Sequence, residues 1–309
     1  MTKTVLILGV SGKIGRHSSE AFSRAGWNVR AYDRQAGNMT AQAKGADVIV
    51  NGLNPPKYHD WEHQIPAITR SVINAARHSG ATVIIPGNVY NIGDRGGEWS
   101  ETTPHHPSTK KGRIREEMER TYEASGVRTV ILRAGNFIDP NHQEDVMSLL
   151  LLRDIQRGNI TVAGNARTLQ AYCYLPDWAH ATVGLAEIRD ALASFEDIPF
   201  PGHSFTAEDL REFLSTELGR ALSLKAFPWW FFTLLGPFWE LAREMLEMRY
   251  LWSTSHSLSG KKLERLLPDF RPTPLEEVWR SSLPDAMRAQ LATSRVPDVR
   301  PRVFQYRPN

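Results

Sequence analysis

Three glycines near the start of the chain have the spacing of a phosphate-binding turn. Residues 9–15 (GVSGKIG) follow an apolar run that predicts a buried strand and precede residues 14–25, which predict a helix ended by Gly26. In such a unit the first glycine permits the tight turn, the second lets backbone approach a pyrophosphate, and the third lets helix and strand pack closely. The helix N-terminus offers free N–H groups and partial positive charge to the phosphates. The residues predicted to bind the cofactor here are Gly9, Ser11, Gly12, Lys13, Ile14 and Gly15.

An acidic residue follows the second predicted strand at the position where a dinucleotide ribose would lie. Asp33 stands 18 residues after Gly15, and its carboxylate can accept hydrogen bonds from the ribose hydroxyls. This carboxylate would repel a 2′-phosphate and favours NAD. The adjacent Arg34 could instead bind that phosphate, so NADP stays open, with NAD preferred.

The elements that must position these residues alternate between strand and helix. Strands are predicted at 4–8, 28–32, 47–50, 82–85 and 129–132, and helices at 65–78 and 110–123. This order predicts a Rossmann-like, doubly wound parallel sheet. The interval 33–47 is too short for a complete unit, and residues 170–188 are predicted as a further strand and helix of the main sheet. The predicted division is an NAD(P)-binding domain over 1–190 and a smaller, mostly helical substrate lobe over 191–309.

The composition of the chain limits which kinds of molecule it is expected to bind. The 309 residues carry a net charge of +3, and the basic residues are dispersed, which argues against a nucleic-acid surface. The single cysteine, Cys173, excludes an internal disulfide, lies in an apolar setting and fits a reducing compartment. No signal segment is evident, and the longest apolar stretch (227–241) is short for a membrane span. We therefore expect a cytoplasmic protein with a small-molecule substrate and no transmembrane segment, and a homodimer is left open.

The glycine spacing resembles that of the short-chain dehydrogenase/reductase superfamily, in its extended or atypical branch of NAD-dependent epimerase/dehydratase-like proteins. The similarity covers most of residues 3–190 and is supported by the motifs at 50–52 (VNG), 131–136 (ILRAGN) and 174–179 (YLPDWA). It implies that Asn51 and Gly52 also contact the cofactor.

The catalytic part departs from that family pattern. The family places Ser or Thr after the fifth strand and Tyr-x-x-x-Lys on the next helix, but here Pro86 stands at the first position and Lys111 and Arg115 at the other two. This arrangement resembles the isoflavone-reductase-like members, in which a lysine acts as acid/base. Lys111 is accordingly predicted as the acid/base and as a cofactor contact, with Arg115 as its cationic neighbour. The alternative is that both are surface cations of an amphipathic helix.

Further residues are predicted for the substrate side. Tyr90 follows the fifth strand and is the other candidate catalytic hydroxyl, and Asn88 and Asn136 are expected to line the substrate cleft. A metal site is not predicted, because the histidines at 105–106 and 142 show no coherent ligand spacing.

These residues support two functions. The first is an NAD(P)-dependent oxidoreductase or epimerase acting on a carbonyl, alcohol or sugar-like substrate. The second is a catalytically silent NAD(P)-binding sensor, which the missing Ser/Tyr/Lys set favours. The aromatic run 227–232 is interpreted as core or pocket wall, with anchoring at a membrane surface as the alternative.

Overall fold

The computed structural model describes residues 2–141 and 144–294. At its centre lies a six-stranded sheet in the order β10-β6-β4-β3-β1-β2, and every neighbouring pair is parallel. The strands are β1 (Thr4–Leu8), β2 (Asn28–Ala31), β3 (Val48–Asn51), β4 (Thr82–Gly87), β6 (Thr129–Arg133) and β10 (Phe195–Pro199). The chain passes from β1 to β2 at one edge and returns to β3 on the other side of β1, which makes the β1/β3 boundary the topological switch point.

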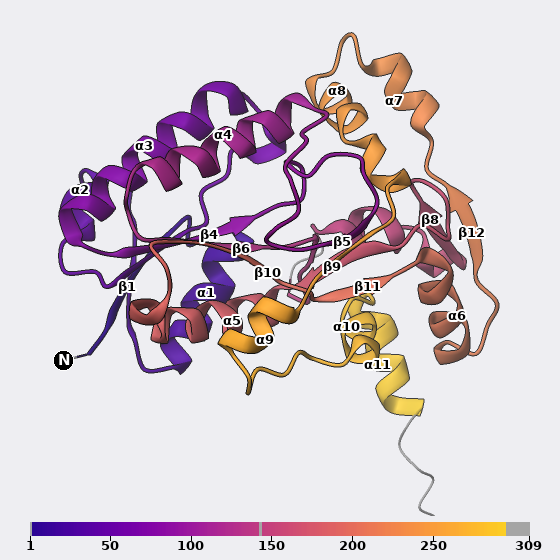
Figure 1. Cartoon of the computed structure of the whole chain (residues 1–309). Helices are drawn as coiled ribbons and strands as arrows, with labels where there is room; N and C mark the ends of the chain where they lie inside the picture. Colours follow the sequence, from indigo (N-terminus) through magenta and orange to yellow (C-terminus); the bar gives the residue numbers. More distant parts are fainter. Residues whose placement is uncertain (1, 142–143, 295–309) are drawn as a thin grey trace, which may run out of the picture.

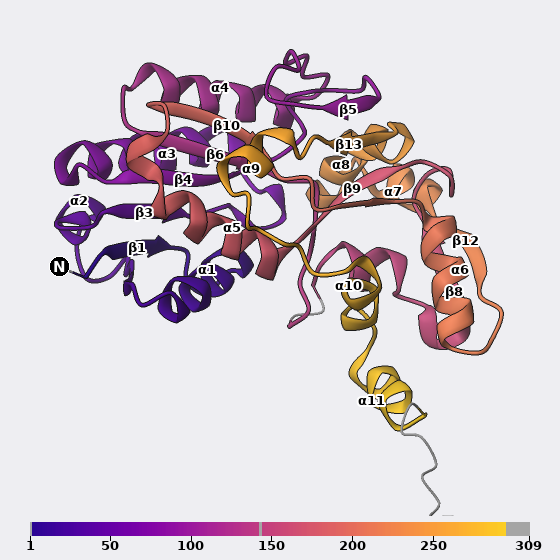
Figure 2. The same ribbon diagram turned by 60° about the horizontal axis from the view of Figure 1, so that its bottom comes forward.

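Helices cover both faces of this sheet (Figures 1 and 2). One face carries α1 (Lys13–Arg24), α5 (Leu175–Glu187) and α9 (Lys261–Leu266), and the other carries α2 (Met39–Ala43), α3 (Trp61–Ser79) and α4 (Lys110–Ala124). Alternate residues of β1 enter the two cores: Val5 and Ile7 face α1 and α5, while Leu6 and Leu8 face the other layer. Strands buried on both faces explain why the sequence shows continuous apolar runs here.

The unit between β2 and β3 is shortened, as predicted. Only the five-residue α2 connects these strands, and Asn38 caps it by accepting a hydrogen bond from the backbone N–H of Ala41 at 2.7 Å. The edge strand β2 is correspondingly short and partly exposed.

A second lobe lies beyond the carboxyl ends of the central strands. It contains a three-stranded sheet of β11 (His203–Phe205), β9 (Gln170–Tyr174) and β7 (Asn136–Ile138), and the two-stranded pairs β8 (Asn159–Val162)/β12 (Ser223–Ala226) and β5 (Gly97–Trp99)/β13 (His256–Leu258). Its α-helices are α6 (Ala207–Glu217), α7 (Trp229–Leu235), α8 (Glu240–Glu247), α10 (Leu275–Ser281) and α11 (Asp285–Ser294). Along the whole described chain, in both lobes, the short helical turns are η1 (Pro56–Tyr58), η2 (Met147–Leu151), η3 (Ile155–Arg157), η4 (Arg189–Ala191) and η5 (Arg249–Ser253).

The chain moves between the two lobes more than once. The prediction that residues 170–188 add a strand to the main sheet is wrong for the strand: β9 pairs with β7 and β11, whereas α5 packs on α1 as expected. Conversely, β10 lies after residue 190 and still joins the central sheet beside β6. The sheets therefore do not separate at residue 190, because strand pairing depends on partners far away in sequence.

Candidate functional site

A cavity of about 840 Å³ lies at the carboxyl ends of β1, β3, β4 and β6. This is the position at which open parallel sheets bind ligands. The predicted site residues found in its wall are Gly12, Lys13, Ile14, Asn51, Gly52, Asn88, Tyr90, Arg115 and Asn136.

The glycine turn after β1 has the backbone that the sequence predicts. Gly9 has a φ of +75°, in the left-handed region that favours glycine. A Cβ on Gly15 would lie 2.6 Å from the carbonyl carbon of Gly9, so only glycine allows α1 to begin this close to β1. At Gly12, which lines the cavity, an added Cβ would have only the Gly9 carbonyl oxygen within 4 Å, at 3.3 Å.

The N-terminus of α1 is open to a ligand. Gly12 is the N-cap residue, no side chain caps the helix, and its first turn contains no acidic residue. Gly12, Lys13 and Ile14 line the cavity, so the orphan N–H groups and the positive end of the helix dipole lie at its wall, and no side chain of the described residues caps them. Lys13 lines the cavity, and its amine donates to the carbonyl of Glu144. Ser11 lies in the turn and is exposed.

Asp33 and Arg34 follow the end of β2 and are exposed. Gln42 holds this segment: its amide nitrogen donates to the Asp33 carbonyl at 2.7 Å, and its amide oxygen accepts from the Asp33 N–H at 2.9 Å. Neither Asp33 nor Arg34 lines the cavity.

Two tyrosine hydroxyls meet on the cavity wall. The Tyr90 hydroxyl lies 3.3 Å from that of Tyr58, and both residues line the cavity. The neighbouring Tyr90 and burial raise the pKa of Tyr58 well above its usual range. Asn88 orders the turn by accepting a hydrogen bond from the Tyr90 N–H at 3.1 Å.

The segment that carries Tyr58 did not stand out in the sequence. Lys57, Tyr58 and Asp60 all have positive φ, of 54°, 62° and 48°. Non-glycine residues seldom adopt this conformation, and such strain concentrates at functional sites. The sequence signal for this segment is the pair of prolines at 55–56, four residues after the end of β3, which marks an irregular connection at the carboxyl edge of the sheet.

Arg115 is buried beneath this segment, which contradicts the surface-cation alternative. Its guanidinium donates to Asn54 Oδ1 at 2.7 Å and stacks 4.7 Å from the Trp61 ring centre. Burial lowers the pKa of Arg115. The side chain supports the strained segment and reaches the cavity.

Lys111 is also buried, but its amine has other partners. It forms ion pairs with Glu244 and, at 2.5 Å, with Glu247, both on α8, and lies 5.1 Å from the Tyr58 ring centre. Burial acts to raise the pKa of Glu247, but the hydrogen bonds from Lys111 outweigh it and lower that pKa. Lys111 does not line the cavity. The surface-cation alternative is therefore wrong for Lys111, and its amine fastens α8 to α4.

A buried ion-pair network fixes the turn that carries Tyr90. Arg133 Nη2 donates to Glu119 and to Asp197, each at 2.7 Å, and its Nη1 donates to the carbonyl of Asn88 at 2.5 Å. His105 lies close to the same two carboxylates. Because the guanidinium occupies the space between these carboxylates, the cluster reads as an ion-pair network. His142, the other histidine weighed as a ligand in the sequence, lies outside the described residues.

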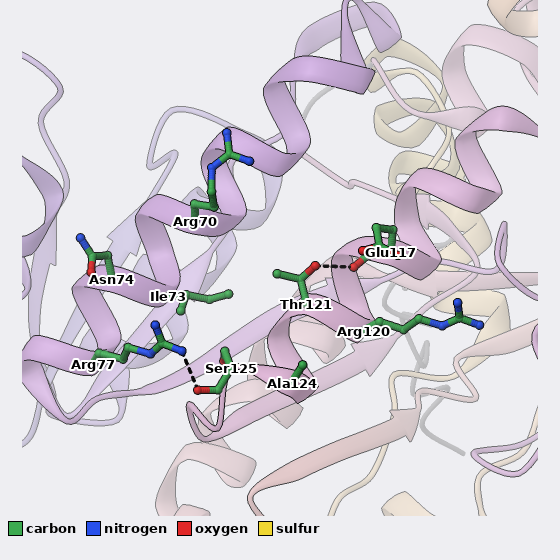
Figure 3. A pocket seen from close by; sticks show the side chains of 9 residues that line it. All are labelled: Arg70, Ile73, Asn74, Arg77, Glu117, Arg120, Thr121, Ala124 and Ser125. Atoms are coloured by element: carbon green, nitrogen blue, oxygen red, sulfur yellow. Dashed lines mark hydrogen bonds between the residues drawn. The ribbon is translucent and has the colours of Figure 1, made fainter.

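A second depression, of about 640 Å³, lies on the outer side of α3 and α4 (Figure 3). Its lining includes Arg70, Arg77 and Arg120. Arg77 is held by the Ser125 carbonyl at 2.9 Å and Arg120 by Glu116 at 3.0 Å. The depression shares no lining residue with the cavity at the glycine turn, and none of the predicted site residues lines it, so it is not the candidate site.

Comparison with solved structures supports the fold. UDP-glucuronic acid 4-epimerase from Bacillus cereus in complex with NAD has a TM-score of 0.73 at 14% identity, covering 93% of this chain and 99% of that one. MoeE5 in complex with UDP-glucose and NAD has a TM-score of 0.70 at 14% identity, covering 94% and 99%. TunA, an NAD-dependent NDP-hexosamine 5,6-dehydratase involved in tunicamycin biosynthesis, has a TM-score of 0.68 at 14% identity, covering 94% and 98%.

The chain thus has the Rossmann-like fold of these NAD-dependent epimerases and dehydratases, which confirms the predicted fold class. No protein-family model matches the sequence, and no curated protein matches it. Among the described helices, none has the length and apolar character needed to cross a membrane.

Proposed function

We propose that this protein is an NAD-dependent oxidoreductase or epimerase acting on a sugar nucleotide or a similar carbonyl or alcohol. One observation carries the proposal: a single cavity extends from the open N-terminus of α1 to the hydroxyls of Tyr58 and Tyr90. A dinucleotide on the glycine turn would therefore extend toward groups able to move a proton. The solved structures of similar fold include complexes with NAD and with UDP-sugars.

The residues of the turn fit the pyrophosphate of such a cofactor. Gly12 leaves open space where backbone must approach it, and the first turn of α1 supplies uncompensated N–H donors. Asp33 would accept the ribose hydroxyls, which favours NAD over NADP, whose phosphate would meet this carboxylate. When bound, the nicotinamide supplies hydride transfer.

Within this proposal Tyr90 is the acid/base. Its side chain lines the cavity, and its hydroxyl lies 3.3 Å from that of Tyr58, whose pKa is raised by the neighbouring Tyr90 and by burial, so that Tyr58 would stay protonated beside it. The motif-based candidate, Lys111, can take this role only if its amine leaves Glu244 and Glu247. The geometry therefore favours Tyr90 over Lys111 as the group that exchanges a proton with substrate.

The test compares Tyr90→Phe, Lys111→Ala and the control Tyr174→Phe, whose hydroxyl lies outside the cavity. With NAD and a panel of UDP-sugars, Tyr90→Phe should lower kcat by at least about 100-fold and leave NAD affinity nearly unchanged, because a general acid/base acts mainly in the transition state. Turnover is followed by NADH absorbance and by chromatography of epimers, and affinity by calorimetry. A loss confined to Lys111→Ala would return the acid/base role to Lys111.

A sensor function is the second candidate, favoured by the ion pairs that hold Lys111 away from the cavity. In that case wild-type protein would bind NAD and turn over no carbonyl or sugar-nucleotide substrate. The same panel separates the two functions.

A further inference from the structure

The hairpin of α7 and α8 presents an unusual apolar surface. Residues 227–239 contain no charged side chain. Five large side chains here are exposed: Trp230 (71%), Phe231 (41%), Leu234 (66%), Phe238 (90%) and Trp239 (42%). Of the exposed large hydrophobic residues in the described part of the chain, only Val10 and Leu149 lie elsewhere. We call these five side chains the aromatic tip. Figure 1 shows α7 and α8 at one edge of the molecule, with their connecting loop pointing away from the central sheet.

Other side chains of the same segment anchor the aromatic tip to the rest of the protein. Phe227 and Trp229 are buried, and the Trp229 indole donates to the carbonyl of Ala163 at 2.6 Å. Arg243 closes the hairpin by donating to the Gly236 carbonyl at 3.2 Å. The two interpretations of the aromatic run thus apply to different residues, since Phe227 and Trp229 belong to the core and the tip does not.

The charges around the tip are unbalanced. Lys225, Arg243 and Arg249 flank it, are exposed, and form no ion pair with a carboxylate among the described residues. The carboxylates of α8 have other partners: Glu240 lies 3.1 Å from His59, and Glu244 and Glu247 share the amine of Lys111. With His59 neutral, these three carboxylates and the cations Lys111, Lys225, Arg243 and Arg249 leave a formal charge of +1 around the tip.

We propose that the aromatic tip inserts into the headgroup region of an anionic lipid bilayer, with Lys225, Arg243 and Arg249 contacting lipid phosphates. Exposed Trp, Phe and Leu side chains flanked by cations match an interfacial anchor. The five side chains of the tip carry no charge, and their polar groups are the indole N–H groups of Trp230 and Trp239, which suit the headgroup level of a bilayer. The hydroxyl of the nearby Thr233 already donates to the Trp229 carbonyl at 3.0 Å. A second copy of this chain is the alternative occupant that the experiment distinguishes.

This inference is independent of the proposed enzymatic function. It does bear on the site, because α8 also contacts the η1 turn that lines the cavity. Docking by the tip would place that side of the cavity near the bilayer.

The experiment measures co-sedimentation of the full-length protein with phosphatidylcholine vesicles and with vesicles containing roughly one-third phosphatidylglycerol. Wild type should bind the anionic vesicles. Leu234→Ser, and the double variant Trp230→Ser/Phe238→Ser, should weaken binding by about tenfold or more, because they remove apolar area that enters the bilayer. Leu149→Ser is the matched control for vesicle binding, since Leu149 is similarly exposed (62%) but lines the cavity and is not part of the tip, and this variant should bind vesicles as wild type does.

The cations are tested separately. Lys225→Ala should weaken binding to anionic vesicles and reduce its salt dependence, whereas Arg157→Ala, an exposed cation elsewhere, should not. Thermal unfolding of each variant checks that it is folded. The proposal is overturned if wild type binds neither vesicle type, or if the Trp230→Ser/Phe238→Ser variant binds anionic vesicles as well as wild type does. A dimer, seen by sedimentation velocity, that dissociates in the double variant would also overturn it, because a second copy would then cover the tip.

Discussion

Substitution at two neighbouring glycines separates cofactor binding from folding. Gly12 has φ −80° and ψ 169°, which any residue adopts; it lines the cavity, and its Cβ would have only the Gly9 carbonyl oxygen within 4 Å, at 3.3 Å. Gly15 has no such freedom, since its Cβ would collide with the backbone of Gly9. We therefore expect Gly12→Val to abolish NAD binding in a folded protein and Gly15→Ala to destabilise the fold.

The magnitudes follow from these contacts. A valine at 12 would keep the pyrophosphate from the α1 N–H groups, and two charge-assisted hydrogen bonds lost at about 1.5–3 kcal/mol each imply at least about a 100-fold rise in Kd. Its cost to folding should be about 1 kcal/mol, because valine is a poor N-cap residue. Gly15→Ala should cost about 3 kcal/mol through overpacking against rigid backbone.

Calorimetric titration with NAD gives Kd, and urea unfolding gives the free energy of unfolding. The reasoning fails if Gly12→Val binds NAD as tightly as wild type. It also fails if Gly15→Ala is as stable as wild type, because the close approach of α1 to β1 would then not require glycine.

Three further changes test other parts of the structure. Asp33→Ala should weaken NAD binding by about 1–3 kcal/mol and shift preference toward NADP, measured by calorimetry with both cofactors; much tighter NADP binding by wild type would show that Arg34 dominates. Glu119→Gln should lower the free energy of unfolding by about 3 kcal/mol, because Arg133 loses a buried carboxylate partner, while the exposed Glu117→Gln on the same helix should change little in urea titrations. The pKa of Glu247 is lower in the folded protein than its ordinary value of 4.5, so the ionised carboxylate stabilises the fold above that value, and this stabilisation is lost as the pH falls through the lowered pKa. Glu247→Gln should therefore reduce the loss of unfolding free energy at acid pH. Parallel curves of unfolding free energy against pH for wild type and variant would contradict this.

The sequence determined the local elements of the nucleotide-binding half. The runs at 4–8, 82–85 and 129–132 are strands in the structure, because a strand buried on both faces needs continuous apolar residues. The glycine turn was equally readable, since its spacing records a backbone constraint at Gly9 and a close approach at Gly15 that no other residue satisfies. The short interval after β2 likewise predicted the reduced α2 unit.

Only the tertiary structure decided which side chains face the cavity. Spacing placed Lys111 at the acid/base position, but Glu244 and Glu247, more than a hundred residues later, draw its amine toward α8. Tyr58 has no motif of its own and reaches Tyr90 through the left-handed backbone of residues 57–60. Similarly, residues 170–174 were expected in the main sheet, but β9 pairs with β7 and β11 in the second lobe. In contrast, β10 lies in the range predicted as the substrate lobe and joins the central sheet. In each case the outcome depends on contacts between residues distant in sequence, whose energies local spacing and periodicity do not record.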